Sequence, residues 1–306
     1  MTRVAAVAVA LVLCSCSVVE HNRRSIARKY ERLGFHVERR TLTSGAMVCR
    51  VGGAGFPVLL VHGFGGTALE TWEHQVRDLV RGGYRVVAPD IYWFGDSVPR
   101  GGMDTAADQA DAIAELLTQL GIRKAHVVGI SFGGFISLEL ARRHPARVGK
   151  LVLIDSAGLK LTPEEHRAML HNFGASSSIT EVLVPRDEEH LKRFLDKVFY
   201  EPRWIPKFVL RELLHKEFWK HKEAKKRILL NMERGGLLPP AALAAVHAET
   251  YVIWGERDLL LPPSLGVRLA RALPSARLAY VPRSGHAPTL EQPVQSTWLI
   301  MRFLDG

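Results

Sequence analysis

Cysteine is scarce in this chain, with three residues among 306, at positions 14, 16 and 49. Cys14 and Cys16 both lie in the apolar segment at the start of the chain, which leaves Cys49 alone in the remainder. Three cysteines placed in this way form no metal-ligand pattern, because such sites need clustered Cys and His residues at short spacings. A disulfide framework is not expected either, since a single cysteine in the body of the chain has no partner there.

Nucleic-acid-binding motifs and internal repeats are also missing. Lysine and arginine number 41 against 31 acidic residues, which gives a net charge of +10 and an isoelectric point near 9.7. Such a charge suits nucleic acid, an anionic membrane surface or simple solubility. Basic and acidic residues are interleaved and no recognition motif accompanies them, so we do not expect nucleic acid to be a partner.

No apolar run reaches the roughly 20 residues that a membrane-spanning helix needs. Residues 1–16 instead place Arg3 before about ten apolar residues, which is typical of a signal peptide. Leu13-Cys14-Ser15-Cys16 resembles a bacterial lipobox, although Cys14 stands where a smaller residue is usual. We therefore expect lipidation at Cys16, attachment to a membrane and a location in the bacterial cell envelope. An uncleaved membrane anchor, ordinary secretion and a misassigned start are the alternatives.

Residues 17–34 form a basic segment of helical character. If Cys16 is acylated, this segment is expected to lie against the bilayer, where each Lys or Arg near anionic headgroups adds about 1 kcal/mol. The alternative is a solvated helix that only spaces the rest of the chain from the membrane.

The remaining residues predict an α/β fold. With 47% hydrophobic residues the chain can bury the core of one large α/β domain or of two smaller ones. An alternating stretch around Thr43-Ser44-Gly45 predicts an antiparallel hairpin, and apolar strands then alternate with amphipathic helices. This alternation predicts a mainly parallel sheet with helices on both faces. The expected strands are PVLLVHG, YRVVAPD, AHVVGI, GKLVLID, TYVIWG and RLAYVP, and the expected helices are 67–81, 105–120, 132–143, 263–272 and 289–304.

Residues 159–236 interrupt this alternation with a charged, helical stretch. An insertion between parallel strands is expected to form a lid over their carboxyl ends, where ligands bind in open α/β folds. The core is then made of residues 35–158 and 237–306. The apolar residues of the insertion line a substrate pocket or, equally well, form the core of the lid itself.

Ser131 lies between a predicted buried strand and a predicted helix, in the sequence GISFGG. Gly129, Gly133 and Gly134 remove side chains where the chain must reverse sharply, so the serine hydroxyl is exposed above a helix N-terminus. The G-x-S-x-G pattern alone is only moderately specific, because chance gives roughly 0.1 matches in a chain of this length. Its position between strand and helix favours a nucleophile.

Asp258 and His286 follow two later strands, in WGERDLLLP and VPRSGHAP. A serine hydroxyl needs a base within hydrogen-bond reach and a third group to orient that base. Parallel strands bring their carboxyl ends to one edge, so these residues are expected to converge on Ser131 as a triad. The glycine-rich VHGFGG loop is expected to supply an oxyanion site made by the backbone N–H groups of Phe64 and Phe132. His62 is expected to order this loop.

The motifs HGFGG, APDIYWFGDS, GISFGG, WGERDLLLP and SGHAP together resemble those of serine hydrolases of the α/β-hydrolase superfamily, from about Val37 to the C-terminus. The resemblance implies that Ser131 is the nucleophile, His286 the general base and Asp258 its orienting acid, with no metal or cofactor. Asp155 is an alternative acid used by some relatives. Trp93 stands where the family usually has Pro-Gly, which places it beside the substrate or in a packing role.

The expected activity is hydrolysis of a carboxylic ester, with a lipid or another apolar acyl ester as substrate. The proposed lipid anchor and the apolar lid favour this class. Hydrolysis of a carbon–carbon bond in a ring-cleavage product is the enzymatic alternative, because GISFGG also resembles those enzymes. A lipoprotein that keeps the fold only as a binding scaffold is a third hypothesis, and the presence of both Ser131 and His286 argues against it.

Overall fold

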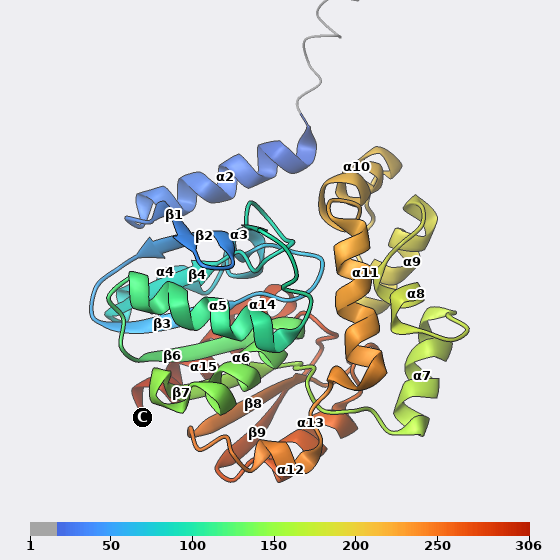
Figure 1. Cartoon of the computed structure of the whole chain (residues 1–306). Helices are drawn as coiled ribbons and strands as arrows, with labels where there is room; N and C mark the ends of the chain where they lie inside the picture. Colours follow the sequence, from blue (N-terminus) through green and yellow to red (C-terminus); the bar gives the residue numbers. More distant parts are fainter. Residues whose placement is uncertain (1–16) are drawn as a thin grey trace, which may run out of the picture.

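The computed structural model describes residues 17–306, and the predicted lipidation site at Cys16 lies outside them. Within this range nine strands form one sheet, in the order β1-β2-β4-β3-β6-β7-β8-β9, with β5 paired to β2 (Figure 1). The strands are β1 His36–Leu42, β2 Gly45–Gly52, β3 Phe56–Val61, β4 Tyr84–Pro89, β5 Val98–Pro99, β6 Ala125–Ile130, β7 Val148–Ile154, β8 Thr250–Gly255 and β9 Ala276–Val281.

The sheet is parallel from β4 to β9, and the β1–β2 hairpin adds an antiparallel edge. The central strands are buried on both faces, as their continuous apolar sequences require, whereas β1 alternates exposed and half-buried residues. The predicted fold class is therefore confirmed.

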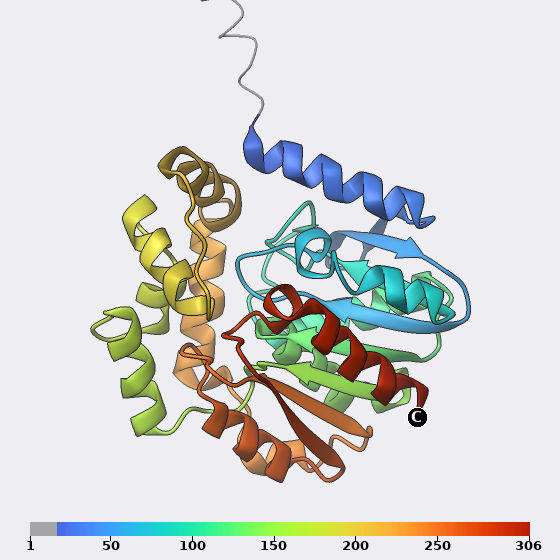
Figure 2. The ribbon, with the colours of Figure 1, turned by 180° about the vertical axis from the view of Figure 1, so that it is seen from behind.

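Helices cover both faces of the sheet (Figures 1 and 2). One face is covered by α5 Ala106–Gln119, α6 Phe132–Arg143, α12 Pro240–Leu243 and α13 Pro263–Ala272. The other is covered by α2 Val18–Arg32, α3 Ala68–Thr71, α4 Val76–Arg81 and α15 Pro293–Asp305.

Two predicted helices are each divided in the structure. The expected helix 67–81 is α3 and α4, because the chain leaves the helical path at Trp72, whose side chain is fully buried in the core. The expected helix 289–304 is a short α14, Pro288–Glu291, followed by α15. Pro293 begins α15, since proline has no N–H for the preceding helix and suits the first turn of a new one.

The helical insertion, residues 159–236, lies between β7 and β8 in sequence and at one end of the sheet (Figure 1). Two π-helical turns interrupt it, and the turn Leu214–Phe218 packs beside the N-terminal helix α2. Its helices are α7 Pro163–Phe173, α8 Ile179–Leu183, α9 Glu188–Val198, α10 Lys207–Leu213 and α11 Lys222–Asn231.

Helix α2 packs against the body of the protein. Ser17 caps it by accepting a hydrogen bond from the Glu20 N–H, and Ile26 and Tyr30 are buried. Arg23 bridges Glu70 of α3 and Glu217 of the helical insertion, at 2.5 Å from each. This packing differs from a free spacer helix, because the apolar side of α2 is already covered by protein. No helix within residues 17–306 is long and apolar enough to cross a bilayer.

Candidate active site

Ser131 occupies the sharp turn that joins β6 to α6. Its backbone has φ 55° and ψ −122°, a conformation that a non-glycine residue rarely adopts. The Ser131 N–H donates to the Ile154 carbonyl at 2.9 Å, which fixes the turn to the neighbouring strand. A side chain at Gly133 would collide with the carbonyl oxygens of Val61 and His62, so only glycine allows β3 to approach this closely.

The imidazole of His286 lies between the other two predicted residues. Its Nε2 is 2.9 Å from Ser131 Oγ, and its Nδ1 is 2.6 Å from Asp258 Oδ2. Asp258 is held in place because its Oδ1 accepts hydrogen bonds from the N–H groups of Leu260 and Leu261. Asp258 and His286 are both buried. This arrangement allows the Ser131 hydroxyl to donate to His286 while the opposite ring N–H donates to the carboxylate.

Asp155, the alternative acid, lies at the end of β7 next to this group. Its Oδ1 accepts a hydrogen bond from the Gly255 N–H at 2.7 Å, and its Oδ2 has no partner among the described residues. Complete burial, assisted by the neighbouring charge of Asp258, raises the pKa of Asp155 well above its usual value. Asp155, Asp258 and His286 also form the one group of potential metal ligands within residues 17–306. The histidine nitrogen that faces the carboxylates is already hydrogen-bonded to Asp258, whereas Asp155 is hydrogen-bonded to neither of the other two residues.

The predicted oxyanion donors flank Ser131. Phe132 is the first residue of α6, where backbone N–H groups have no partner within the helix. Phe64 lies in the glycine-rich loop after β3, and a Cβ at the adjacent Gly63 would be 3.1 Å from Ser131 Cβ. Neither N–H has a hydrogen-bond acceptor among residues 17–306. Both amides are thus available to a developing negative charge.

His62 is fully buried below this loop and uses both ring nitrogens. Its Nδ1 lies 2.8 Å from the Gly63 carbonyl, and its Nε2 accepts from the Ile91 N–H at 3.0 Å. Burial lowers the pKa of His62, which favours the neutral ring that this pattern requires. His62 therefore links the oxyanion loop to the loop after β4, and no ring nitrogen remains for a substrate.

The Ser131 pocket is a small cavity of about 170 Å³ between the sheet and the helical insertion. No lysine, arginine, aspartate or glutamate lines it, and the insertion contributes apolar side chains from α8, α9 and the π-helical turn. These apolar residues are Leu183, Phe194, Leu195, Val198, Phe199 and Phe218. The pocket thus favours an apolar group beside the reactive hydroxyl.

Trp93 does not line the Ser131 pocket, which differs from one of the two roles expected for it. Its Nε1–H donates to the Gly102 carbonyl at 3.2 Å, and its ring packs against His221 and the Arg227 guanidinium of the helical insertion. The Trp93 side chain therefore has the packing role, joining the loop after β4 to α11.

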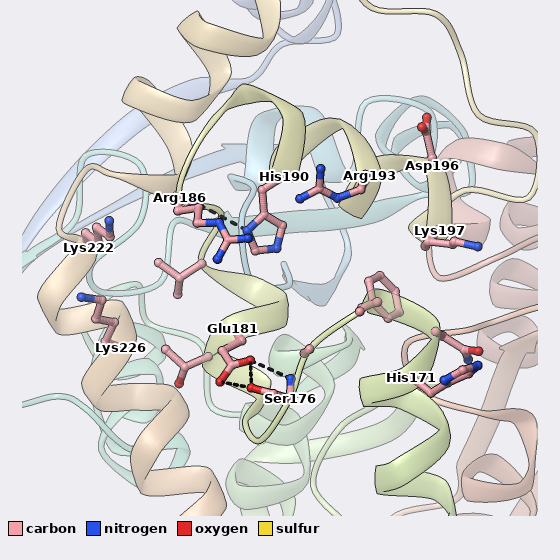
Figure 3. A pocket seen from close by; sticks show the side chains of 16 residues that line it. His171, Ser176, Glu181, Arg186, His190, Arg193, Asp196, Lys197, Lys222 and Lys226 are labelled. Carbon is pink, nitrogen blue, oxygen red and sulfur yellow. Dashed lines mark hydrogen bonds between the residues drawn. The ribbon is translucent and has the colours of Figure 1, made fainter.

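A larger cavity of about 890 Å³ lies within the helical insertion and contains none of the three converging residues (Figure 3). Basic side chains of α9 and α11 surround it, including Arg193, Lys222 and Lys226. Helix α9 separates the two cavities, because Phe194 and Val198 on its other side line the Ser131 pocket. Size alone therefore does not mark the reactive site in this chain.

Glu291 belongs to none of the sequence motifs, yet it organises the loop that carries His286. Its carboxylate accepts hydrogen bonds from the N–H groups of Gly285 at 2.8 Å and Tyr200 at 2.6 Å. The Ser284 hydroxyl and the Ala287 N–H also donate to it. The only local sequence signal for this role is that Glu291 is an acidic residue in the first turn of α14. Such a residue is expected there in any case, because a negative charge stabilises the start of a helix.

The fold, the strained serine turn and the hydrogen-bonded Ser131, His286 and Asp258 define an α/β hydrolase. Residues 58–297 match the model of the Alpha/beta hydrolase family, and the chain belongs to that family.

Among individual relatives, the chain is 31% identical over 273 residues to Lipase 1 of Psychrobacter immobilis, covering 86% of this chain and 83% of the lipase. It is 30% identical over 273 residues to the 2-hydroxy-6-oxo-6-phenylhexa-2,4-dienoate hydrolase of Burkholderia cepacia, covering 82% and 88% of the two chains. The crystal structure of a membrane phospholipase A, described as a bacterial virulence factor, matches with a TM-score of 0.80 and 27% identity. That match covers 100% of this chain and 99% of the other.

Proposed function

We propose that this protein hydrolyses carboxylic esters of apolar acyl groups through an acyl-enzyme on Ser131. The observation that carries the proposal is the position of His286, which lies within hydrogen-bond distance of both Ser131 Oγ and Asp258 Oδ2. This geometry suits a hydroxyl that must lose its proton as it attacks a carbonyl carbon.

In the proposed reaction, Ser131 Oγ attacks the ester carbonyl while His286 Nε2 takes the hydroxyl proton. Asp258 holds the imidazole in the required tautomer and stabilises its charged form. The N–H groups of Phe64 and Phe132 bind the tetrahedral oxyanion, and His286 returns the proton to the leaving alcohol. Water then repeats these steps on the acyl-enzyme and releases the acid.

The apolar lining of the Ser131 pocket supports an apolar acyl group as the bound part of the substrate. No lysine, arginine, aspartate or glutamate borders the pocket, so transfer of an apolar acyl chain from water into it is favourable. We propose that the helical insertion acts as a lid, because α9 and the turn Leu214–Phe218 form the outer wall of this pocket. The lipase and phospholipase relatives support the same substrate class.

Carbon–carbon bond hydrolysis is the second candidate, and the dienoate hydrolase relative is the observation in its favour. A dienoate substrate carries a carboxylate, which needs a cation or several hydrogen-bond donors when it is buried. Lysine and arginine are absent from the lining of the Ser131 pocket. This difference favours the ester.

We further propose that the mature protein is attached to a membrane of the bacterial cell envelope by acylation of Cys16, which the lipobox-like sequence supports. Mass spectrometry of the mature N-terminus tests this point, and an unmodified or uncleaved residue 16 contradicts it.

A fluorophosphonate probe tests the catalytic proposal. We expect the folded protein to be labelled and Ser131→Ala to remain unlabelled. Labelling that persists in this variant refutes the assignment of Ser131, and a folded wild type that resists labelling supports the scaffold hypothesis. A chain-length series of p-nitrophenyl esters then defines the acyl group, with a preference for about eight carbons or more expected for a lipase.

A further inference from the structure

The segment between α9 and α10 exposes aromatic side chains to solvent. Trp204 is 81% exposed and Phe208 is 62% exposed, the highest values among the aromatic residues of the described chain. Of the other tryptophans within residues 17–306, Trp72 and Trp254 are fully buried. A single exposed aromatic ring is ordinary, but two strongly exposed rings within five residues of chain favour an interaction surface.

Positive charge accompanies these rings. Arg203 and Lys207 flank Trp204 and Ile205 in the sequence PRWIPKF, and both basic residues are exposed. No aspartate or glutamate occurs between residues 202 and 211, and neither Arg203 nor Lys207 forms an ion pair within residues 17–306. Aromatic rings beside unpaired cations are typical of segments that lie in the headgroup layer of an anionic bilayer.

The exposed segment leads into α10, which lies next to the start of the described chain (Figures 1 and 2). The Val19 N–H of α2 donates to Glu212 of α10, and Lys216 Nζ donates to Ser17 Oγ at 2.8 Å. Sixteen residues with an apolar, signal-like sequence precede Ser17. A membrane attached to those residues would therefore lie on the same side of the protein as α10.

The same segment also adjoins the proposed catalytic machinery. Phe199, the residue after α9, lines the Ser131 pocket. The N–H of His286 donates to the Val198 carbonyl at 2.8 Å, and the Tyr200 N–H donates to Glu291 beside the histidine loop. A surface that binds residues 200–208 therefore also lies close to the Ser131 pocket.

We propose that Trp204 and Phe208, flanked by Arg203 and Lys207, form a second membrane contact that docks the helical insertion on an anionic bilayer. This inference rests on the proposed attachment at the N-terminus and adds a defined orientation to it. Docking holds the segment that follows Phe199 of the Ser131 pocket at the lipid surface, where an apolar acyl ester is found. The partner is the bilayer itself, and the contact is separate from the acylated cysteine.

Tryptophan quenching in vesicles tests the docking. The full chain is purified in detergent and reconstituted into phosphatidylcholine vesicles that contain phosphatidylglycerol and acyl-brominated lipid. Trp298 on α15 is the matched control, because it is 53% exposed and lies on a helix that covers the sheet. We compare the wild type with Trp204→Phe and Trp298→Phe, and hydrolysis of soluble p-nitrophenyl butyrate shows that each variant is folded.

Quenching in the wild type and in Trp298→Phe, with a loss of about half or more of it in Trp204→Phe, is the expected result. Equal quenching in Trp204→Phe and wild type overturns the proposal. A protein that sediments with vesicles but shows no quenching also overturns it, while leaving the N-terminal attachment intact. A protein that does not sediment overturns both. Replacing Arg203 and Lys207 together by glutamate is expected to weaken quenching on anionic vesicles, and an unchanged signal contradicts the role of charge.

Discussion

Asp155 and Asp258 follow the neighbouring strands β7 and β8 and place carboxylate oxygens within 4.8 Å of the same imidazole, yet only Asp258 is hydrogen-bonded to His286. The Asp155 carboxylate instead accepts the Gly255 N–H. The two acids therefore have different tasks, and substitutions at each position distinguish them.

Asp258→Asn is expected to lower kcat by about 10⁴-fold, because an amide no longer fixes the tautomer in which His286 can accept the serine proton. Asp155→Asn is the matched control and is expected to keep kcat within about tenfold of the wild type. Steady-state hydrolysis of a p-nitrophenyl ester measures both. If Asp155→Asn is the more damaging change, the roles of the two acids are reversed.

Asp155 also predicts a dependence of stability on pH. Burial raises its folded-state pKa above the unfolded value, so the stabilisation present at low pH is lost as pH rises toward the folded pKa. Asp155→Asn removes this loss. Its free energy of unfolding is therefore expected to rise relative to that of the wild type as the pH increases above about 4. Urea denaturation of both proteins from acid to neutral pH measures the difference. A difference that stays constant with pH contradicts the assignment.

The serine turn predicts a strict requirement for glycine at position 133. Gly133→Ala drives a methyl group into the carbonyl oxygens of Val61 and His62, so β3 or the oxyanion loop must move. We expect a loss of about 1–3 kcal/mol in stability and of at least about 100-fold in kcat. Gly101→Ala meets open space and is the control, with a change within about 0.5 kcal/mol. Wild-type kinetics in Gly133→Ala would show that the loop is more adaptable than this packing implies.

Arg23 predicts a coupling between α2 and the Ser131 pocket. Arg23→Ala leaves Glu70 and Glu217 without their shared cation, and the free energy of unfolding is expected to fall by about 1–3 kcal/mol. Because Phe218 follows Glu217 and lines the pocket, kcat/KM for a long-chain ester should fall as well. Arg24→Ala is the matched control, since Arg24 is exposed and lies 3.7 Å from Glu20. Thermal unfolding and ester kinetics measure both effects, and equal behaviour of the two variants argues against the coupling.

The sequence predicts the elements that local patterns define. Continuous apolar strands, amphipathic helices and the glycines around Ser131 specify the sheet, and the carboxyl ends of parallel strands explain why Ser131, Asp258 and His286 meet. Local patterns do not reveal the breaks at Trp72 and Pro293, because helical spacing continues through both positions. Burial of Trp72 and the missing N–H of Pro293 decide the structure there.

Contacts between distant segments could not be predicted from local patterns. The link from Arg23 to Glu217 joins a helix near the start of the chain to the helical insertion, and no spacing rule marks either residue. The position of Trp93 depends in the same way on α11, which covers it from a later part of the chain. The positions of these side chains depend on packing between elements, which a single sequence does not display.

The short connection at Ser17 has a mechanical consequence. One residue separates Cys16 from the first turn of α2, and Ser17 is held by Glu20 and by Lys216 of the insertion. A pull on the start of the chain would therefore act directly on the contact between Ser17 and Lys216 of the insertion. If the chain is attached at Cys16 as proposed, tension along the anchor would reach the insertion through Lys216, two residues before Phe218 of the Ser131 pocket.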